Sequence, residues 1–260
     1  MKVVIIGSGN TATVLGGKIA AAGHQLLQVV ARRQEPAELL AKEWGCGYTT
    51  RWADTDRSAD IYVIALSDRA VEGLAGVLSL PGKLVVHTAG AVAASVLLPV
   101  SANSGVLYPL QSLKAAVRPF PEIPFLVDAN QPEDLPVIEA FAGTLSQQVQ
   151  RADDATRLKL HLSAILVNNF TNYLYTQAAE FCRQEQIDFT LLLPLIRETA
   201  ERVQRFPPKD MQTGPAIRGD RDTQKRHLEL LNNYQNIKEL YNLFTIQIEA
   251  FYRAAEISAP

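Results

Sequence analysis

Three small residues near the start of the chain have the spacing of a phosphate-binding turn. Gly7, Gly9 and Ala12 form the pattern GxGxxA directly after an apolar run at residues 3–6. Gly7 permits a tight turn, Gly9 lets the backbone approach a pyrophosphate, and Ala12 lets the following helix pack on the strand. Unpaired N–H groups at the start of that helix favour an anion. We therefore expect a dinucleotide to bind the turn, the alternative being a tight strand-to-helix turn without a ligand; the turn consists of Gly7, Ser8, Gly9, Asn10, Thr11 and Ala12.

Two arginines follow the second predicted strand, which spans residues 26–31. In a dinucleotide-binding fold this strand end meets the adenosine ribose, where an Asp or Glu would bind the 2′-hydroxyl of NAD. Arg32 and Arg33 stand there instead. A guanidinium binds a 2′-phosphate through paired hydrogen bonds and stacks on adenine. The pair predicts NADP rather than NAD as cofactor, and an ordinary pair of surface arginines is the other interpretation.

Polar residues also end two further predicted strands. Ser67 and Asp68 follow one buried strand, and His87 and Thr88 end the next. Because the carboxyl ends of parallel strands border the ligand in this fold, we expect Ser67 and Asp68 beside the cofactor. His87 is a candidate catalytic residue on the same side of the sheet. A structural histidine that donates to a backbone carbonyl is an equal alternative.

The elements that must position these groups repeat as strand, polar turn and helix. This order predicts an α/β fold with an N-terminal doubly wound parallel Rossmann sheet, which binds ligands at the carboxyl ends of its strands. From residue 153 onward helical periodicity replaces the strand signals, over residues 155–184, 189–205, 223–232 and 237–255. We therefore predict an NAD(P)-binding Rossmann domain at residues 1–150 and an all-α substrate or dimerisation domain at residues 151–260.

A stripe of polar residues runs along the first predicted helix of the second domain. Its members are spaced by three, four or seven residues and so share one face, and apolar side chains cover much of the rest; they are Asp154, Arg157, His161, Asn168, Asn172 and Tyr175. The stripe predicts either the border of a cleft or a face in contact with water or a partner subunit.

A loop in the second domain carries a second candidate site. Residues 214–220 have the composition of a loop, and Arg218 could hold a substrate carboxylate through paired hydrogen bonds, with Asp220 beside it. Asp220 or Asp222 would equally serve as the N-cap of a helix that begins near Thr223. We expect Arg218 and Asp220 to contact substrate, with helix capping as the alternative.

The bulk composition excludes several classes of function. The 260 residues are 47% hydrophobic and 20% charged, which is typical of a globular protein of one or two domains. A net charge of -2 gives no attraction to nucleic acid or to an anionic membrane, and no apolar run is long enough to span a bilayer. Cys46 and Cys182 lack metal-binding spacing, so we expect no metal site. We expect no signal peptide and a cytoplasmic protein.

The helices predicted over residues 223–255 carry more apolar side chains than a small helical domain needs for its own core. Leucine, tyrosine and phenylalanine recur along them; the residues are Leu228, Leu231, Tyr234, Leu240, Tyr241, Phe244 and Phe251. We therefore expect a homodimer that forms through the C-terminal helices.

An ordered set of motifs gives the chain a resemblance to a known group. The motifs are GxGxxA at 7–12, His87-Thr-Ala-Gly-Ala91, Tyr108-Pro-Leu-Gln-Ser112, His161 with Asn168-Asn169, Gly214-Pro-Ala-Ile-Arg-Gly-Asp220 and His227-Leu228. The chain resembles Rossmann-like proteins with a C-terminal helical domain of unknown function. These are often assigned by similarity to pyrroline-5-carboxylate reductase, ketopantoate reductase or deazaflavin-dependent NADP oxidoreductase.

The resemblance implies a nucleotide-binding N-terminal domain and an all-α domain similar to the C-terminal domain of 6-phosphogluconate dehydrogenase. In related dehydrogenases the first long helix after the nucleotide domain presents a catalytic lysine and an asparagine. We expect His161 and Asn168 to take those places, with His161 exchanging a proton and Asn168 orienting a carbonyl or carboxylate. Two residues depart from the group, which usually has serine at the position of Ala89 and histidine at that of Tyr108.

These observations favour an NADP-dependent oxidoreductase that transfers hydride between the nicotinamide and a small carbonyl or imine compound. A dinucleotide-binding sensor or scaffold without turnover is the alternative, because a fold does not determine a function. The sequence does not identify the substrate.

Overall fold

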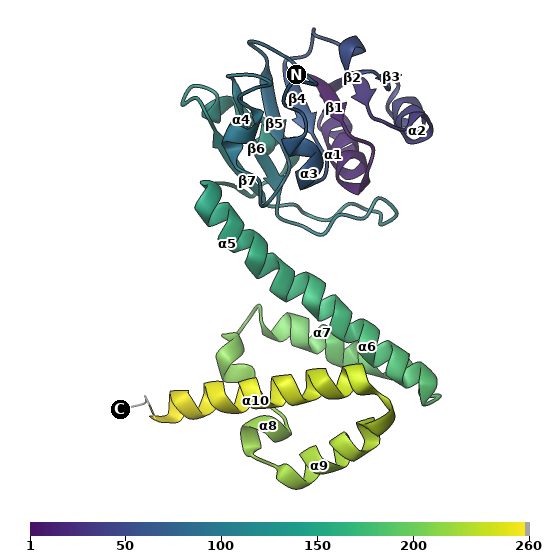
Figure 1. Cartoon of the computed structure of the whole chain (residues 1–260), viewed down its shortest axis with the longest axis vertical. Helices are drawn as coiled ribbons and strands as arrows, with labels where there is room; N and C mark the ends of the chain where they lie inside the picture. Colours follow the sequence, from purple (N-terminus) through teal and green to yellow (C-terminus); the bar gives the residue numbers. More distant parts are fainter. Residues whose placement is uncertain (258–260) are drawn as a thin grey trace. The chain divides into compact units, whose positions relative to one another are not determined.

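The computed structural model describes residues 1–257, with side chains to residue 254. The chain forms two compact units, which we call unit 1 (Met1–Asn169) and unit 2 (from Phe170 onward). Each is described separately, and Figure 1 labels their elements. Residues 258–260 of the predicted helical domain lie outside the described residues.

Unit 1 is built on an eight-stranded sheet with the order β3-β2-β1-β4-β5-β6-β7-β8 in the described chain. The strands are β1 (Lys2–Ile6), β2 (Gln25–Val30), β3 (Gly47–Thr49), β4 (Ile61–Ile64), β5 (Leu84–His87), β6 (Ser104–Pro109), β7 (Phe125–Ala129) and β8 (Val149–Arg151). This confirms the predicted Rossmann-like α/β fold.

The sheet is mixed rather than wholly parallel, which corrects the prediction at one edge. The first six strands in sheet order, from β3 at the edge to β6, are all parallel. β7 pairs antiparallel with β6, and β8 is parallel to β7. A parallel connection needs a crossover, usually through a helix, and residues 110–124 between β6 and β7 form no helix. The chain therefore returns beside β6 in the opposite direction, and α4 (Leu135–Leu145) then provides the crossover to β8.

Helices cover both faces of this sheet, so alternate residues of β1 enter different cores. Val3 and Ile5 pack with α1 (Asn10–Ala21) and α4, whereas Val4 and Ile6 pack in a cluster that includes Val71 of α3 (Asp68–Glu72). Burial on both faces explains why β1 reads as a continuous apolar run. The remaining short elements of this part are α2 (Gln34–Trp44), η1 (Trp52–Asp54) and η2 (Ala94–Leu97).

The chain passes from unit 1 into unit 2 within a run of helical residues. α5 (Asp154–Ala164), a π-helical turn η3 (Ile165–Phe170) and α6 (Thr171–Gln184) follow one another directly, as the periodicity over 155–184 predicts. The last strand ends at Arg151, next to the predicted boundary, whereas the compact units divide after Asn169. α5 belongs to unit 1 because its first turn is bonded to the segment after β5. The domain boundary at 150/151 stays a prediction.

Unit 2 is helical throughout its described residues. After α6 it contains η4 (Phe189–Leu192), α7 (Leu193–Arg202), η5 (Pro208–Met211), α8 (Pro215–Arg218), α9 (Arg221–Leu230), η6 (Leu231–Asn233) and α10 (Gln235–Ile257). The all-α character predicted for the C-terminal part is confirmed. Over residues 1–257, no helix combines the length and apolar character that crossing a bilayer demands.

Candidate active site

The glycine turn after β1 has the backbone that a dinucleotide-binding turn requires. Gly7 has a φ of +134°, and a Cβ there would lie 2.2 Å from the carbonyl oxygen of Ala65. Its N–H donates to the carbonyl of Val30 at 2.8 Å, which fixes the turn against β2. Only glycine fits this position, because any side chain would be strained and would clash with β4.

The start of α1 leaves room for an anion. Gly9 is the N-cap residue, no side chain caps the helix, and the first turn contains no acidic residue. A Cβ at Gly9 would meet no atom within 4 Å in the described structure. Ala12 is fully buried against the strand, as its position in the motif predicts. These residues fit a dinucleotide pyrophosphate over the helix N-terminus.

The other predicted cofactor residues lie at strand ends. Arg32 and Arg33 are exposed in the connection from β2 to α2, and Arg33 is the N-cap residue of that helix. Ser67 is the exposed N-cap residue of α3, and Asp68 begins the helix. All four positions are at the carboxyl ends of their strands, and a contact with cofactor remains a prediction for each.

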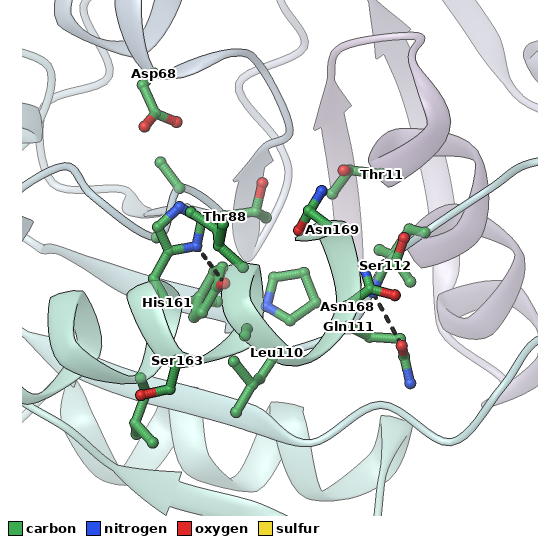
Figure 2. A pocket seen from close by; sticks show the side chains of 18 of the residues that line it. Thr11, Asp68, Thr88, Leu110, Gln111, Ser112, His161, Ser163, Asn168 and Asn169 are labelled. Carbon is green, nitrogen blue, oxygen red and sulfur yellow. Dashed lines mark hydrogen bonds between the residues drawn. The ribbon is translucent and has the colours of Figure 1, made fainter. Parts of the chain in front are cut away.

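A cleft of about 630 Å³ opens beside the glycine turn, wholly within unit 1. Its lining comes from the first turn of α1, the ends of β4, β5 and β6, and the second half of α5 with η3. The polar lining residues are Thr11, Asp68, Thr88, Tyr108, Gln111, Ser112, His161, Ser163, Asn168 and Asn169. Figure 2 shows most of these side chains directed toward the same space. The cleft therefore combines predicted cofactor residues with the predicted catalytic His161 and Asn168.

A tyrosine and a histidine form a hydrogen-bonded pair in this cleft. The Tyr108 hydroxyl lies 2.9 Å from Nδ1 of His161, and the two rings meet edge to face (Figure 2). A Cβ at Gly90 would lie 2.7 Å from His161 Nδ1, so the absence of a side chain there admits the imidazole. Burial, with a smaller effect from Asp68, raises the pKa of the Tyr108 hydroxyl. Tyr108 therefore keeps its proton at neutral pH.

The π-helical turn contributes to one wall of the cleft. Asn168 and Asn169 lie in η3 and both line the cleft, together with Val167. A π-turn inserts a residue into the helical repeat and often occurs at functional sites. The predicted polar stripe assumed an uninterrupted helix, so it included Asn168 and did not include its neighbour Asn169.

His87 does not reach the cleft, in contrast to its predicted catalytic position. It is fully buried beneath the segment after β5, and its Nδ1 accepts from the N–H of Ala89 at 3.2 Å. Burial, helped by the charge of Arg157, lowers the pKa of His87 to about 4. The buried imidazole therefore has a structural role, but through a bond that it accepts from the 88–94 segment rather than the donation to a backbone carbonyl that the alternative described.

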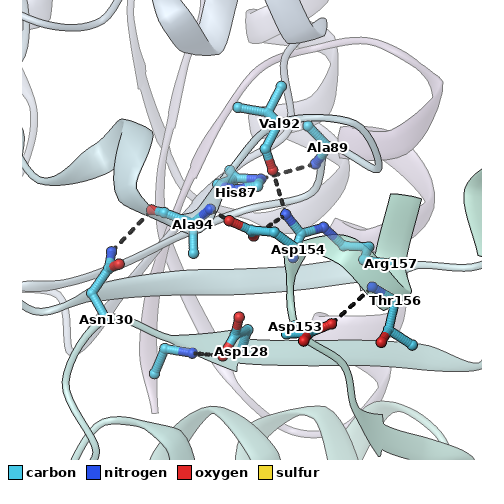
Figure 3. Close-up of polar contacts among 11 residues, drawn as sticks. His87, Ala89, Val92, Ala94, Asp128, Asn130, Asp153, Asp154, Thr156 and Arg157 are labelled. Atoms are coloured by element: carbon cyan, nitrogen blue, oxygen red, sulfur yellow. Dashed lines mark hydrogen bonds and ion pairs between the residues drawn. The ribbon is translucent and has the colours of Figure 1, made fainter. Parts of the chain in front are cut away.

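The first two residues of the polar stripe hold that same segment. Arg157, 1% exposed, donates through Nη2 to the carbonyl of Val92 and to Asp154 Oδ1, the latter at 2.7 Å. Asp154 in turn accepts from the N–H of Ala94 at 3.0 Å. Figure 3 shows these contacts converging on residues 92–94. Asp154 and Arg157 thus fix the loop, while His161, one turn further along α5, faces the cleft.

The two predicted substrate residues of the C-terminal part belong to unit 2. Asp220 caps α9: its carboxylate accepts from the N–H of Thr223 at 3.0 Å and from the Thr223 hydroxyl at 2.8 Å. These bonds lower the pKa of Asp220. Arg218 is exposed at the end of α8. The capping interpretation of Asp220 accounts for its contacts, and a substrate contact of either residue remains a prediction.

The sequence did not identify Tyr108 as a site residue. Tyr108 differs from the histidine of the resembling group, and it lies next to Pro109 at the carboxyl end of buried β6, just as His87 lies at the carboxyl end of β5. That signal, a polar side chain at the carboxyl end of a strand, would have found it. The described residues contain no group of three or more His, Cys, Asp or Glu side chains able to hold a metal ion.

Two family descriptions match successive parts of the chain. Residues 2–90 match "NADP oxidoreductase coenzyme F420-dependent", and residues 123–248 match "Domain of unknown function (DUF2520)". A comparison with curated proteins finds no match.

Solved structures are similar to this chain over nearly its whole length. The crystal structure of a provisionally named NADP oxidoreductase from Bacteroides fragilis is 37% identical, with 96% of this chain and 98% of that chain covered and a TM-score of 0.87. An imine reductase from Myxococcus stipitatus in complex with NADP+ is 17% identical, with 98% and 95% covered and a TM-score of 0.67. A 1-pyrroline-5-carboxylate reductase from Streptococcus pyogenes is 14% identical, with 96% and 98% covered and a TM-score of 0.62. The last two share the fold.

Proposed function

We propose that this chain, which belongs to the family that joins an NADP oxidoreductase domain to the DUF2520 domain, is an NADP-dependent oxidoreductase acting on a small carbonyl or imine compound. The observation that carries the proposal is the position of the Tyr108–His161 pair in a cleft that also includes Thr11 of the glycine turn. A proton donor pair beside a dinucleotide turn suits the reduction of a polar double bond.

Residues of three strand ends would hold the cofactor. The turn from Gly7 to Ala12 receives the pyrophosphate, Arg32 and Arg33 the 2′-phosphate, and Thr88 borders the nicotinamide side of the cleft. When bound, the cofactor supplies or accepts a hydride at C4 of its nicotinamide.

The protein's own groups would handle the proton and the orientation of the substrate. The Tyr108 hydroxyl donates a proton to the carbonyl oxygen or imine nitrogen, since its raised pKa keeps it protonated at neutral pH. His161 Nδ1, bonded to that hydroxyl, would return a proton to the Tyr108 oxygen while Nε2 of the same ring takes one from water. Asn168 offers an amide to orient the substrate. Apolar lining residues such as Leu110 and Leu160 restrict water around the reacting atoms.

Fluorescence titration with NADPH and with NADH tests the cofactor assignment. We expect the wild-type protein to bind NADPH more tightly than NADH. Arg32→Asp is expected to weaken NADPH about tenfold or more and NADH far less, because only NADPH has a 2′-phosphate for the guanidinium. Equal losses for both would show that Arg32 does not recognise this phosphate, and failure to bind either below about millimolar concentrations would remove the cofactor assignment.

Turnover tests the enzymatic part of the proposal. NADPH oxidation is followed with a panel of small aldehydes, ketones and cyclic imines. The assay with the active compound is then repeated on the Tyr108→Phe and Asn168→Ala variants. Tyr108→Phe should lower kcat about 100-fold or more while leaving NADPH affinity unchanged, since a positioned proton donor contributes about that factor. A cofactor that binds tightly without any turnover would favour a sensor.

We also propose that the protein is a homodimer through the helices of unit 2. Among described residues 170–254 only Cys182, Ala216, Gln224 and Leu231 are buried, although the helices are rich in large apolar side chains. A set of helices that cannot bury its apolar face alone is stabilised when a second copy covers it. Sedimentation velocity at micromolar concentration tests this, and a monomer would contradict it.

A further inference from the structure

The connection between β6 and β7 lies against the cofactor-binding half of unit 1. We call residues 110–124 the strap; it extends from the sheet as a long loop in Figure 1. Its two ends are joined, because the N–H of Leu110 donates to the carbonyl of Pro124 at 2.8 Å and Gln111 Nε2 donates to the carbonyl of Glu122 at 3.2 Å. The strap is therefore a loop whose two ends are hydrogen-bonded to each other next to the sheet.

The strap reaches the first residue of α1. The N–H of Ala115 donates to Oδ1 of Asn10 at 3.0 Å, a bond between residues 105 positions apart. Ser112 and Leu113, earlier in the strap, line the cleft together with Thr11. The side chain of Asn10, which directly follows Gly9, is thus occupied by the strap.

A second attachment holds the far part of the strap on the side of α1. Phe120 packs on Gly17 so closely that a Cβ at Gly17 would lie 2.6 Å from the phenyl ring. The Arg118 guanidinium lies 3.7 Å from the centre of that ring and pairs with Glu43 at 3.4 Å. The charge of Arg118 is therefore balanced within the protein, and the strap is fixed to α1 at Ala115 and again at Phe120.

One cation remains on the part of the strap nearest the glycine turn. Lys114 directly precedes Ala115 and is exposed, and its carbonyl accepts from the N–H of Val117 at 3.1 Å, whereas its ammonium group makes no hydrogen bond or ion pair with the described residues. The turn from Gly7 to Thr13 contains no charged side chain, so no cation of its own would balance a bound pyrophosphate. A lysine ammonium on a flexible stem is well suited to a phosphate.

We propose that the strap forms one wall of the dinucleotide groove and that Lys114 binds the pyrophosphate. The inference rests on the proposed cofactor, and it assigns Lys114 a different phosphate from the one assigned to Arg32. Asn10 is at the helix start where the pyrophosphate would sit, whereas Arg32 follows β2, where the ribose would sit.

Cofactor affinities of charge variants test the assignment. Lys114→Gln should weaken NADPH and NADH by the same factor, about two- to fivefold at low ionic strength, since both contain the pyrophosphate and the lysine is exposed. The loss should shrink at high salt, because exposed charges are screened. Lys114→Arg should restore the affinity for both. Lys42→Gln, which removes an exposed lysine from α2, is the matched control and should change neither.

The outcomes separate this inference from the proposed function. Unchanged affinity of Lys114→Gln for both cofactors, or a loss confined to NADPH, would overturn the pyrophosphate contact while the wild-type protein still binds NADPH. A wild-type protein that binds neither cofactor would overturn the proposed function and, with it, this inference.

Discussion

The two compact units of this protein bury their apolar side chains to very different extents. In unit 1 the four residues Val3 to Ile6 are fully buried, and side chains from both faces of the sheet fill separate cores. In unit 2 four described residues are buried, and large apolar side chains such as Leu191 and Ile246 are mostly exposed. Unit 1 is closed around its own core, whereas unit 2 has an apolar surface that a single copy does not cover.

Both units have exposed ion pairs, such as Arg118–Glu43 in unit 1, but unit 1 also buries an arginine and a histidine. Arg157 is held through Nη2 and His87 through Nδ1, while the other nitrogens of both side chains have no hydrogen-bond partner among the described residues. The ion pairs of unit 2, such as Arg183–Glu180 and Arg221–Glu249, include exposed arginines. Exposed pairs of this kind contribute about 0–1 kcal/mol, so they do not replace a missing core. Unit 1 thus has a core of its own, whereas the apolar side chains of unit 2 would gain burial only in the proposed dimer.

The largest expected effect is on unit 1 and comes from its glycine turn. Gly7→Ala should lower the free energy of unfolding by roughly 3 kcal/mol or more, because the methyl group would enter the Ala65 carbonyl at a strained φ. Chemical denaturation measures the loss, which should not depend on protein concentration.

Gly9→Ala is the matched control for that change. Its Cβ would point into open space at a negative φ, so folding should change by less than about 1 kcal/mol while NADPH binding weakens at least about tenfold. A Gly9→Ala protein as destabilised as Gly7→Ala would show that the space above Gly9 is not open in solution.

Acid should weaken unit 1 through His87. The folded-state pKa of about 4 lies below the ordinary 6.5, so the unfolded chain binds a proton first as the pH falls. The stability that His87 contributes is complete above about pH 6.5 and is lost on the way to pH 4, by up to about 3 kcal/mol. Denaturation curves at several pH values for the wild type and His87→Asn test this: the variant should show a smaller loss, and parallel losses would contradict it.

Association should depend on unit 2 alone. Ile246→Glu, at a site 62% exposed on α10, should raise the Kd of the proposed dimer about tenfold or more, since it removes apolar burial and adds a charge. Leu39→Glu changes a side chain that is 63% exposed on α2 and should leave the Kd unchanged. Sedimentation over a concentration series measures both, and equal effects would erase the distinction between the units.

A small effect on stability is expected in the cleft. Tyr108→Phe removes the hydrogen bond to His161 and should cost about 1 kcal/mol of unfolding free energy, with no change in association. Denaturation and NADPH titration on the same samples provide the check. A loss of NADPH affinity above about tenfold would place Tyr108 in the cofactor site rather than in proton transfer.

Local patterns in the sequence predicted much of unit 1. The run from Val3 to Ile6, the glycine turn and the helix after it are encoded within a short segment, so their geometry follows from neighbouring residues. The reversal of β7 was not predicted because strand direction depends on how residues 110–124 cross the molecule. That path is set by contacts such as Asn10 with Ala115, far apart in sequence.

The site was predicted in part for the same reason. His161 and Asn168 were identified from helical spacing, and both line the cleft. Tyr108 is 53 residues from its partner, and no local pattern pairs them. His87 lies at the carboxyl end of a strand, as predicted, but its side chain is buried in the core beneath residues 88–94. The sequence pattern does not determine this direction of the side chain.

The place of β6 in the sheet has a consequence for how such proteins diversify. β6 lies between the segments 2–90 and 123–248 that match known families, and it carries Tyr108. His161 lies in the second segment. A chimaera that exchanged either segment between two relatives would take Tyr108 from whichever parent supplied the junction. The Tyr108 hydroxyl and the His161 imidazole could then come from different parents. To keep the pair together, the junction that contains β6 must be transferred with the segment 123–248.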